Sequence, residues 1–320
     1  MKKGLIITAV ILLLTGAALF TVALAKAGFD VSRLSTATYE TNTYTAEGDF
    51  TNIDIRCDSS ADVTLKPSED GAVRVVCEEN AKNKHTVTVE EETLQITVHD
   101  ERQWYERISL YAKATKVTVY LPAAAYNRLQ IETDTGDVAV PADFSFETAE
   151  VKADTGEVTF AASVTGQLKI GTHTGDIQIR DLHAGALDLT VTTGRVTVTD
   201  VACGGDLSLT VGTGKATLTN LTCVNLSSTG DTGDLTLTNV VASGSLTVER
   251  DTGDVRFENS DAATITVKTS TGDVTGTIRT AKIFIPRSST GSVYVPGTDT
   301  GGRCEIITST GNIEITLSDN

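Results

Sequence analysis

The residues with the clearest potential for chemistry in this sequence are aspartates in short Asp-Thr-Gly motifs. The first lies in TDTGDV, residues 133–138, and Asp-Thr-Gly is the catalytic tripeptide of aspartic proteases. Those enzymes need only two aspartates, which share one proton. Here the motif returns as DTGE at 154–157 and as DTGD at 231–234 and 251–254. Such repetition indicates an architectural role, so we expect no catalysis by these aspartates.

The histidines and the common catalytic motifs supply no other candidate. His85, His99, His173 and His183 share no spacing typical of metal ligands, and His173 stands where other repeats have Asp. No G-x-S-x-G, P-loop or H-E-x-x-H pattern occurs. The sequence thus predicts a protein that is not an enzyme, with no catalytic, cofactor-binding or metal-binding residue and no cofactor.

The Thr-Gly pairs within these motifs mark an internal repeat that continues to the end of the chain. Ten pairs occur at intervals of 19 or 20 residues, and apolar residues flank most glycines in the pattern L-x-I-x-x-x-T-G-D-V-x-V. This alternation predicts two short strands in each repeat, one on either side of the Thr-Gly turn. The glycines are Gly136, Gly156, Gly175, Gly194, Gly214, Gly233, Gly253, Gly272, Gly291 and Gly311.

A unit of about 20 residues cannot bury its apolar face alone, so neighbouring repeats must stack. We therefore predict an all-β fold, a β-solenoid (single-stranded β-helix) of about ten regular 19–20-residue coils plus irregular N-terminal coils, preceded by one transmembrane helix. An antiparallel meander or sandwich is the alternative, but it gives no reason for a constant period. Leu207 and Leu226 should then be buried neighbours on successive coils.

Two polar columns should run along the turns of such a solenoid. Acidic residues beside the Thr-Gly pairs form one ridge, which Arg195 and Lys215 interrupt. Carboxylates about 5 Å apart repel one another, and Ca²⁺ would relieve that repulsion, but we favour solvated turn residues. The ridge residues are Asp134, Asp137, Asp154, Glu157, Asp176, Asp231, Asp234, Asp251, Asp254 and Asp273. The second column, at another corner, is a predicted Asn/Asp ladder of Asp181, Asp200, Asn220, Asn239 and Asn259.

The cysteines test the predicted stacking. Cys203 and Cys223 each follow a Thr-Gly glycine by nine residues and should stack on adjacent coils. Cys57 and Cys77 are also 20 residues apart, and we expect a second stacked pair there, with Cys304 alone in the leucine column. We favour thiols over disulfides for both pairs, although the exported location would allow either.

The N-terminal segment is a separate element. An uncharged, mostly apolar run of 22 residues, 4–25, follows two lysines. It is long enough to cross a hydrocarbon core of about 30 Å, with the rest of the chain outside the cell. We favour an uncleaved anchor, and a signal peptide cleaved after Ala23-Leu24-Ala25 is the alternative.

Four segments follow from these patterns. We expect an N-terminal transmembrane anchor or signal peptide at 1–28, a linker at 29–48, irregular first coils and a cap at 49–128, and regular β-solenoid repeats at 129–320. Residues 100–111 interrupt the pattern, and we interpret them as an insertion or a cap that shields the open end of the core.

Several stretches resemble a known family. The apolar N-terminus, VTLKPSEDGAVRVVCEE at 63–79, QWYERISL at 103–110 and KVTVYLPAAAYNRLQIETDTGDV at 116–138 are similar to the bacterial putative-adhesin family of β-strand repeats, a domain of unknown function. The resemblance covers roughly residues 45–320. It implies an exported or membrane-tethered β-solenoid of the bacterial envelope, with relatives beside envelope-stress systems, and it supplies no catalytic residue.

We favour a non-enzymatic scaffold or adhesin-like binding module, tethered to the cell membrane by the N-terminal helix, that presents Thr-rich faces to an envelope protein or a glycan. One alternative is an accessory or sensory partner of an envelope-stress membrane system. A second is a polysaccharide-active enzyme, for which the predicted turns are too short to wall a cleft. The net charge of −16 argues against nucleic acid as a partner.

Overall fold

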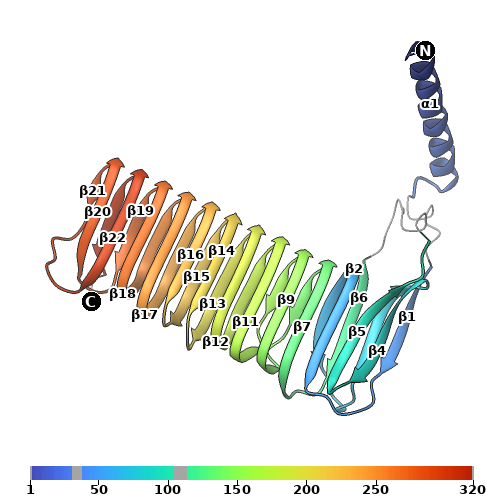
Figure 1. Cartoon of the computed structure of the whole chain (residues 1–320), viewed down its shortest axis with the longest axis horizontal. Helices are drawn as coiled ribbons and strands as arrows, with labels where there is room; N and C mark the ends of the chain where they lie inside the picture. The colour runs from blue at the N-terminus through green and yellow to red at the C-terminus, as the bar shows by residue number, and fades with distance from the viewer. Residues whose placement is uncertain (1, 31–37, 104–113, 319–320) are drawn as a thin grey trace.

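The computed structural model describes residues 2–30, 38–103 and 114–318, which form one α-helix and 23 β-strands (Figure 1). The strands build a long solenoid, and the helix lies outside it at the N-terminal end (Figure 1). The predicted all-β solenoid class is therefore confirmed. Most of the stretch 100–111, interpreted as an insertion or cap, lies outside the described residues.

The helix α1 (Lys2–Lys26) contains the apolar segment found in the sequence. Residues 4–26 are long and apolar enough to cross a membrane, by length and composition, and that window buries nothing within the protein. Thr8, Thr15 and Thr21 each donate a hydroxyl hydrogen bond to the carbonyl oxygen four residues earlier, at 3.0, 2.8 and 2.8 Å. These hydroxyls are satisfied without water, which suits an apolar surrounding.

Each regular coil places one strand on each of two faces, joined through a Thr-Gly corner. In one coil, β14 (Leu207–Thr213) leads through Gly214 into β15 (Ala216–Cys223). Leu207 pairs in parallel register with Leu187 of the preceding coil and Leu226 of the following coil, and all three side chains are buried. The predicted burial and stacking of Leu207 and Leu226 are confirmed.

The strand order along the two faces follows from the pairings. The first face contains β4 (Asn83–Glu90), β5 (Thr93–Asp100), the first part of β2 (Asn52–Pro67), β7 (Ala125–Thr135), β9 (Ser145–Thr155), β11 (Ser163–Thr174), the second part of β12 (Ile177–Thr193), β14, β16 (Leu226–Thr232), the second parts of β17 (Leu235–Thr252) and β18 (Val255–Thr271), β22 (Gly302–Thr310) and β20 (Lys282–Thr290). The second face contains β1 (Tyr39–Thr45), β3 (Arg74–Asn80), β6 (Thr115–Leu121), the second part of β2, β8 (Val138–Val140), β10 (Val158–Phe160), the first part of β12, β13 (Val196–Cys203), β15, the first parts of β17 and β18, β19 (Val274–Ile278), β23 (Ile313–Leu317) and β21 (Val293–Tyr294).

Alternate side chains along these strands point into one continuous apolar core between the faces. The core extends from Ile53 to Ile315, and its largest fully buried side chains are Phe146, Phe160 and Phe257. Because each coil is only two strands wide, the neighbouring coils supply most of the contacts that exclude water from its interior.

The N-terminal end departs from the regular pattern. β2 stacks in parallel on the first regular coil, whereas β1, β3 and β4 join the two faces as antiparallel strands. The expected stacking of Cys57 with Cys77 is therefore wrong, because Cys77 lies on β3, which pairs with β1 and β6 rather than with β2. Residues 39–45, which fall within the expected linker, form β1.

The C-terminal end reorders the last coils. β22 pairs with β18 on one side and with β20 on the other, and β23 lies between β19 and β21 in the same way. The final repeat is thus inserted before the ninth, so that β20 and β21 are outermost although they precede β22 in the chain (Figure 1). Cys304 lies in the leucine column as predicted, between Ile265 and Phe284.

Candidate functional site

The acidic ridge lies along the Thr-Gly corner, and its aspartates act on the coil beside them. The backbone N–H of Glu157 donates to Asp137 Oδ1 at 2.8 Å, and that of Arg195 donates to Asp176 Oδ1 at 2.8 Å. These carboxylates cap backbone donors that the corner would otherwise leave to water. These aspartates act as hydrogen-bond acceptors that stabilise the turn.

Among the other residues at this corner, His173 and Asp154 are exposed, whereas Asp273 is half-buried. His173 Nδ1 lies 3.3 Å from an oxygen of Asp154, and both side chains are largely in solvent. Across residues 2–30, 38–103 and 114–318, the ligand atoms placed closely enough to share a metal ion belong to Cys77, Glu79 and His85, away from this ridge.

The second corner carries the predicted Asn/Asp ladder. Asn220 Nδ2 donates to Asp200 Oδ1 at 2.7 Å, Asn239 Nδ2 to Asn220 Oδ1 at 3.0 Å, and Asn259 Nδ2 to Asn239 Oδ1 at 2.8 Å. Asp181 and these four residues have φ between 51° and 55°, a left-handed conformation that Asn and Asp tolerate better than most residues. The predicted ladder is confirmed, and its side-chain hydrogen bonds link corners whose backbone is in the left-handed conformation.

Regular columns of hydroxyls cover part of the second face. The parallel register puts Thr197, Thr217 and Thr236 in one outward column, and Thr199, Thr219 and Thr238 in the next. Neighbouring coils repeat about every 4.8 Å, so these side chains form a two-column array on a rigid surface. On the first face, a depression of about 320 Å³ is lined by Asp188, Asp206, Asn225 and Ser245 among others.

One coil interrupts the apolar core with a buried arginine. Arg250 is 5% exposed, and its Nη2 donates to Ser228 Oγ at 2.8 Å, while its Nε has no partner. Ser228 is aligned with Leu209 of the preceding coil, so a small polar residue replaces a leucine at this inward position. Gly230 has no side chain and leaves room for the guanidinium. Burial lowers the pKa of Arg250 from its usual value.

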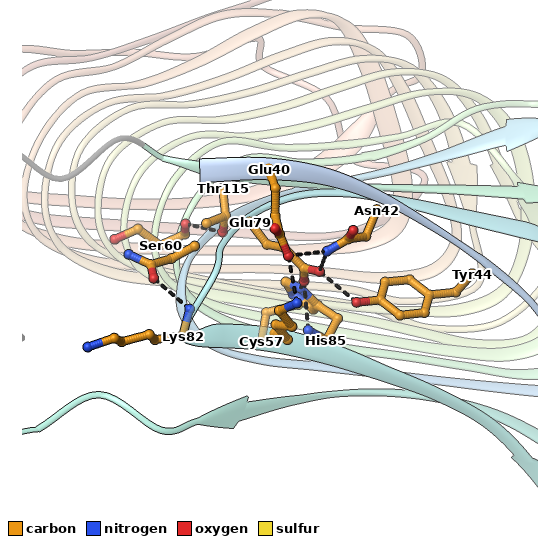
Figure 2. A network of polar contacts seen from close by, with 11 residues as sticks. Glu40, Asn42, Tyr44, Cys57, Ser60, Glu79, Lys82, His85 and Thr115 are labelled. Carbon is orange, nitrogen blue, oxygen red and sulfur yellow. Dashed lines mark hydrogen bonds and ion pairs between the residues drawn. The ribbon is translucent and has the colours of Figure 1, made fainter. Parts of the chain in front are cut away.

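The N-terminal end holds a second buried polar group, which sequence analysis missed. Glu79 on β3 accepts hydrogen bonds from Asn42 at 2.7 Å and from Tyr44 at 2.6 Å, both on β1 (Figure 2). Its other oxygen, Oε2, lies 2.6 Å from His85 Nδ1 and 2.7 Å from the His85 backbone nitrogen. The side chains of Glu79 and His85 are at most 1% exposed.

These contacts determine the charge of Glu79. Burial by itself would raise the pKa of Glu79, but the hydrogen bonds from Tyr44, Asn42 and His85 outweigh it, and the pKa lies below its usual value. Burial, together with the hydrogen bond to Glu79, raises the pKa of Tyr44 well above its usual value. The structure therefore holds a carboxylate, rather than a carboxylic acid, inside the protein near neutral pH.

Cys57 and Cys77 belong to the same cluster. Cys57 Sγ lies 3.8 Å from His85 Nε2, and the pKa of Cys77 is raised by burial, with smaller contributions from Glu79 and Cys57. No sequence motif marks this cluster, because its residues come from four separate strands: β1, β2, β3 and β4. The polar residues at inward positions of β3 and β4 were the one available hint.

The other predicted cysteine pair lies on the regular coils. The pairing of Ala202 with Thr222 puts Cys203 beside Cys223 on the adjacent coil, as expected. Both are buried thiols, and burial, followed by the neighbouring Cys203, raises the pKa of Cys223 to about 12. They pack as small apolar side chains.

The arrangement defines a two-faced parallel β-solenoid with repeated Thr-Gly corners. The chain belongs to the Toastrack DUF4097 family, whose matches cover residues 50–213 and 202–320. This membership confirms the resemblance to a family of unknown function. No curated protein matches the chain.

Several solved structures match this chain at low sequence identity. A putative adhesin from Bacteroides fragilis is 14% identical, with 88% of this chain and 99% of that chain covered and a TM-score of 0.43. A putative adhesin from Parabacteroides merdae is 11% identical, with 88% and 98% covered and a TM-score of 0.47. A putative lipid binding protein from Parabacteroides distasonis is 14% identical, with 88% and 98% covered and a TM-score of 0.45.

Proposed function

We propose that the protein is a non-enzymatic binding module of the bacterial cell surface, tethered by α1 and displaying the second face of its solenoid to an envelope glycan or protein. The observation that carries the proposal is the in-register array of outward threonines on three successive coils. Such an array offers hydroxyl donors and acceptors at a constant spacing of about 4.8 Å. A repeating polymer is the natural partner for a repeating surface.

The construction of the solenoid supports this role. Both faces are built on strands whose side chains are held by a packed core, so the array is preorganised and loses little entropy on binding. The corners between the strands are short, and their polar groups serve the backbone. The apolar α1 supports a position at the membrane, with the acidic body of the chain held away from anionic lipid.

Binding is tested with the full chain in detergent on a glycan array and on isolated cell walls. We expect the Thr217→Glu/Thr219→Glu double variant to lose at least about tenfold in affinity, because two carboxylates replace the central hydroxyls of the array. The matched control is Thr190→Glu/Thr192→Glu, which places two glutamates two residues apart on one strand of the first face, both at exposed positions. Equal binding by both variants would contradict a role for the second face.

Tethering is tested separately by fractionation of cells that express the full chain. An uncleaved anchor keeps the protein in the membrane fraction, and protease added to intact cells removes the solenoid. Recovery of a soluble chain that begins at Lys26 would show cleavage instead. Absence of glycan and wall binding, together with capture of a membrane protein through residues 1–48, would favour the accessory role in an envelope-stress system.

A further inference from the structure

The buried cluster at the N-terminal end combines side chains that are metal ligands in many proteins. Cys57 comes from β2, Cys77 and Glu79 from β3, and His85 from β4. The ligand atoms of Cys77, Glu79 and His85 all lie within 4.8 Å of one another, and the Sγ of Cys57 is 3.8 Å from Nε2 of His85. All four side chains are buried.

Glu79 fixes the imidazole in one orientation. Its Oε1 is occupied by Asn42 and Tyr44, and its Oε2 holds Nδ1 of His85, which leaves Nε2 directed at the sulfur of Cys57 (Figure 2). A carboxylate that accepts from one imidazole nitrogen while the other nitrogen binds metal is the usual support of a metal-bound histidine. Glu79 is therefore placed to orient a ligand, with its own oxygens already in use.

The spacing suits a thiophilic cation. With Zn–S of about 2.3 Å and Zn–N of about 2.0–2.1 Å, the sulfur and nitrogen of a tetrahedral site lie about 3.6 Å apart. The separation of 3.8 Å between Cys57 and His85 is close to that value. Cys57 lies outside the group of Cys77, Glu79 and His85 whose ligand atoms are all within 4.8 Å of one another, so a metal site needs a small movement of its side chain. We propose that Cys77, Nε2 of His85 and, after that movement, Cys57 bind a thiophilic d¹⁰ cation of the Zn²⁺ class, with Glu79 as the positioning residue.

The charges and protons balance for Zn²⁺. Binding displaces one proton from each of the two thiols to solvent, and two thiolates then neutralise the dication. Nδ1 keeps its proton and donates a hydrogen bond to the Glu79 carboxylate, so the imidazole stays neutral. Hard cations such as Ca²⁺ prefer several oxygen ligands, and the only carboxylate of this cluster, Glu79, already accepts hydrogen bonds at both oxygens.

The site would join three strands at the end where the chain enters the solenoid. β2 belongs to the stacked coils, whereas β3 and β4 are held there by antiparallel pairings. A metal bond to all three would lock the irregular end onto the regular coils, beside the strand β1 that continues toward the membrane helix. This role is independent of any ligand that the outer faces bind.

The proposal is tested on the full chain, purified in detergent under reducing conditions and freed of metal. We expect one equivalent of Zn²⁺ by elemental mass spectrometry after dialysis, a rise of the thermal midpoint with Zn²⁺ and none with Ca²⁺. Co²⁺ in its place should give a thiolate-to-metal charge-transfer band. These readouts need no variant, so they decide the question even where a substitution prevents folding.

Variants then assign the ligands. Cys57→Ser, Cys77→Ser and His85→Gln should each abolish the cobalt band, and Glu79→Gln should weaken Zn²⁺ binding by about 10–100-fold. Cys203→Ser and Cys223→Ser, at the buried pair on the regular coils, should keep one equivalent of Zn²⁺. Three results would overturn the proposal: no Zn²⁺ on the folded reduced chain, Zn²⁺ binding by the Cys57 and Cys77 variants as tight as that of the parent chain, or a Cys57–Cys77 disulfide in protein isolated from cells.

Discussion

At the scale of single residues, the glycine of each Thr-Gly pair explains why the tetrapeptide is repeated. Gly175 has a φ of 145°, and a Cβ atom there would collide with the carbonyl oxygen of Gly156 on the adjacent coil. Neighbouring coils approach one another backbone to backbone at this corner, which only glycine allows. The aspartate that follows then caps the next coil. The protease-like motif is thus a packing motif.

Gly175→Ala should destabilise the protein by at least about 1–3 kcal/mol, because it combines a strained φ with a backbone collision. The control is Gly171→Ala on β11, the strand that leads into this corner, where a Cβ would meet nothing within 4 Å and φ is not positive. That variant should be neutral or stabilising by about 0.5–1 kcal/mol. Chemical unfolding followed by circular dichroism measures both, and equal stabilities would contradict the packing role of the corner.

At the scale of the elements, the strand register could be predicted from the sequence because it is a repeated local pattern. Alternation fixes which side chains face inward, and the constant period fixes which of them are neighbours, so Leu207, Leu226, Cys203 and Cys223 were placed correctly. The cluster around Glu79 could not be found in this way. It forms between strands that break the period, and antiparallel pairing of irregular strands depends on turns and end effects that no repeat encodes.

Leu207→Asp tests that register at one strand. Leu207 is 1% exposed between two other leucines, so a carboxylate there would be buried and unpaired. We expect a loss of about 4–5 kcal/mol or more in the free energy of unfolding. Thr210→Asp, three residues later and facing solvent, should change it by no more than about 1 kcal/mol. A Leu207 variant with the thermal midpoint of the parent chain would invalidate the register.

At the scale of the whole molecule, both ends of the solenoid depart from sequence order, and at the C-terminal end the departure decides which strands form the open sheet edge. An exposed edge is a template for pairing with other chains. At the C-terminal end the outermost strand on the first face is β20, which contains Pro286 and, among the described strands, pairs with β22 alone. Proline lacks an N–H and is tolerated at such an edge. The ninth repeat, with the least regular pattern, therefore closes the stack.

Hydrogen exchange followed by mass spectrometry tests this order of coils. An edge strand opens by breaking one ladder of hydrogen bonds, whereas an inserted strand must break two. Edge amides therefore exchange through local openings of lower free energy. After correction for intrinsic rates, amides of β22 should exchange more slowly than those of β20 by about tenfold or more. The interior strand β14 provides the reference for full protection. A solenoid stacked in sequence order would reverse the result, because residues 302–310 would then be the edge and 282–290 the inserted strand.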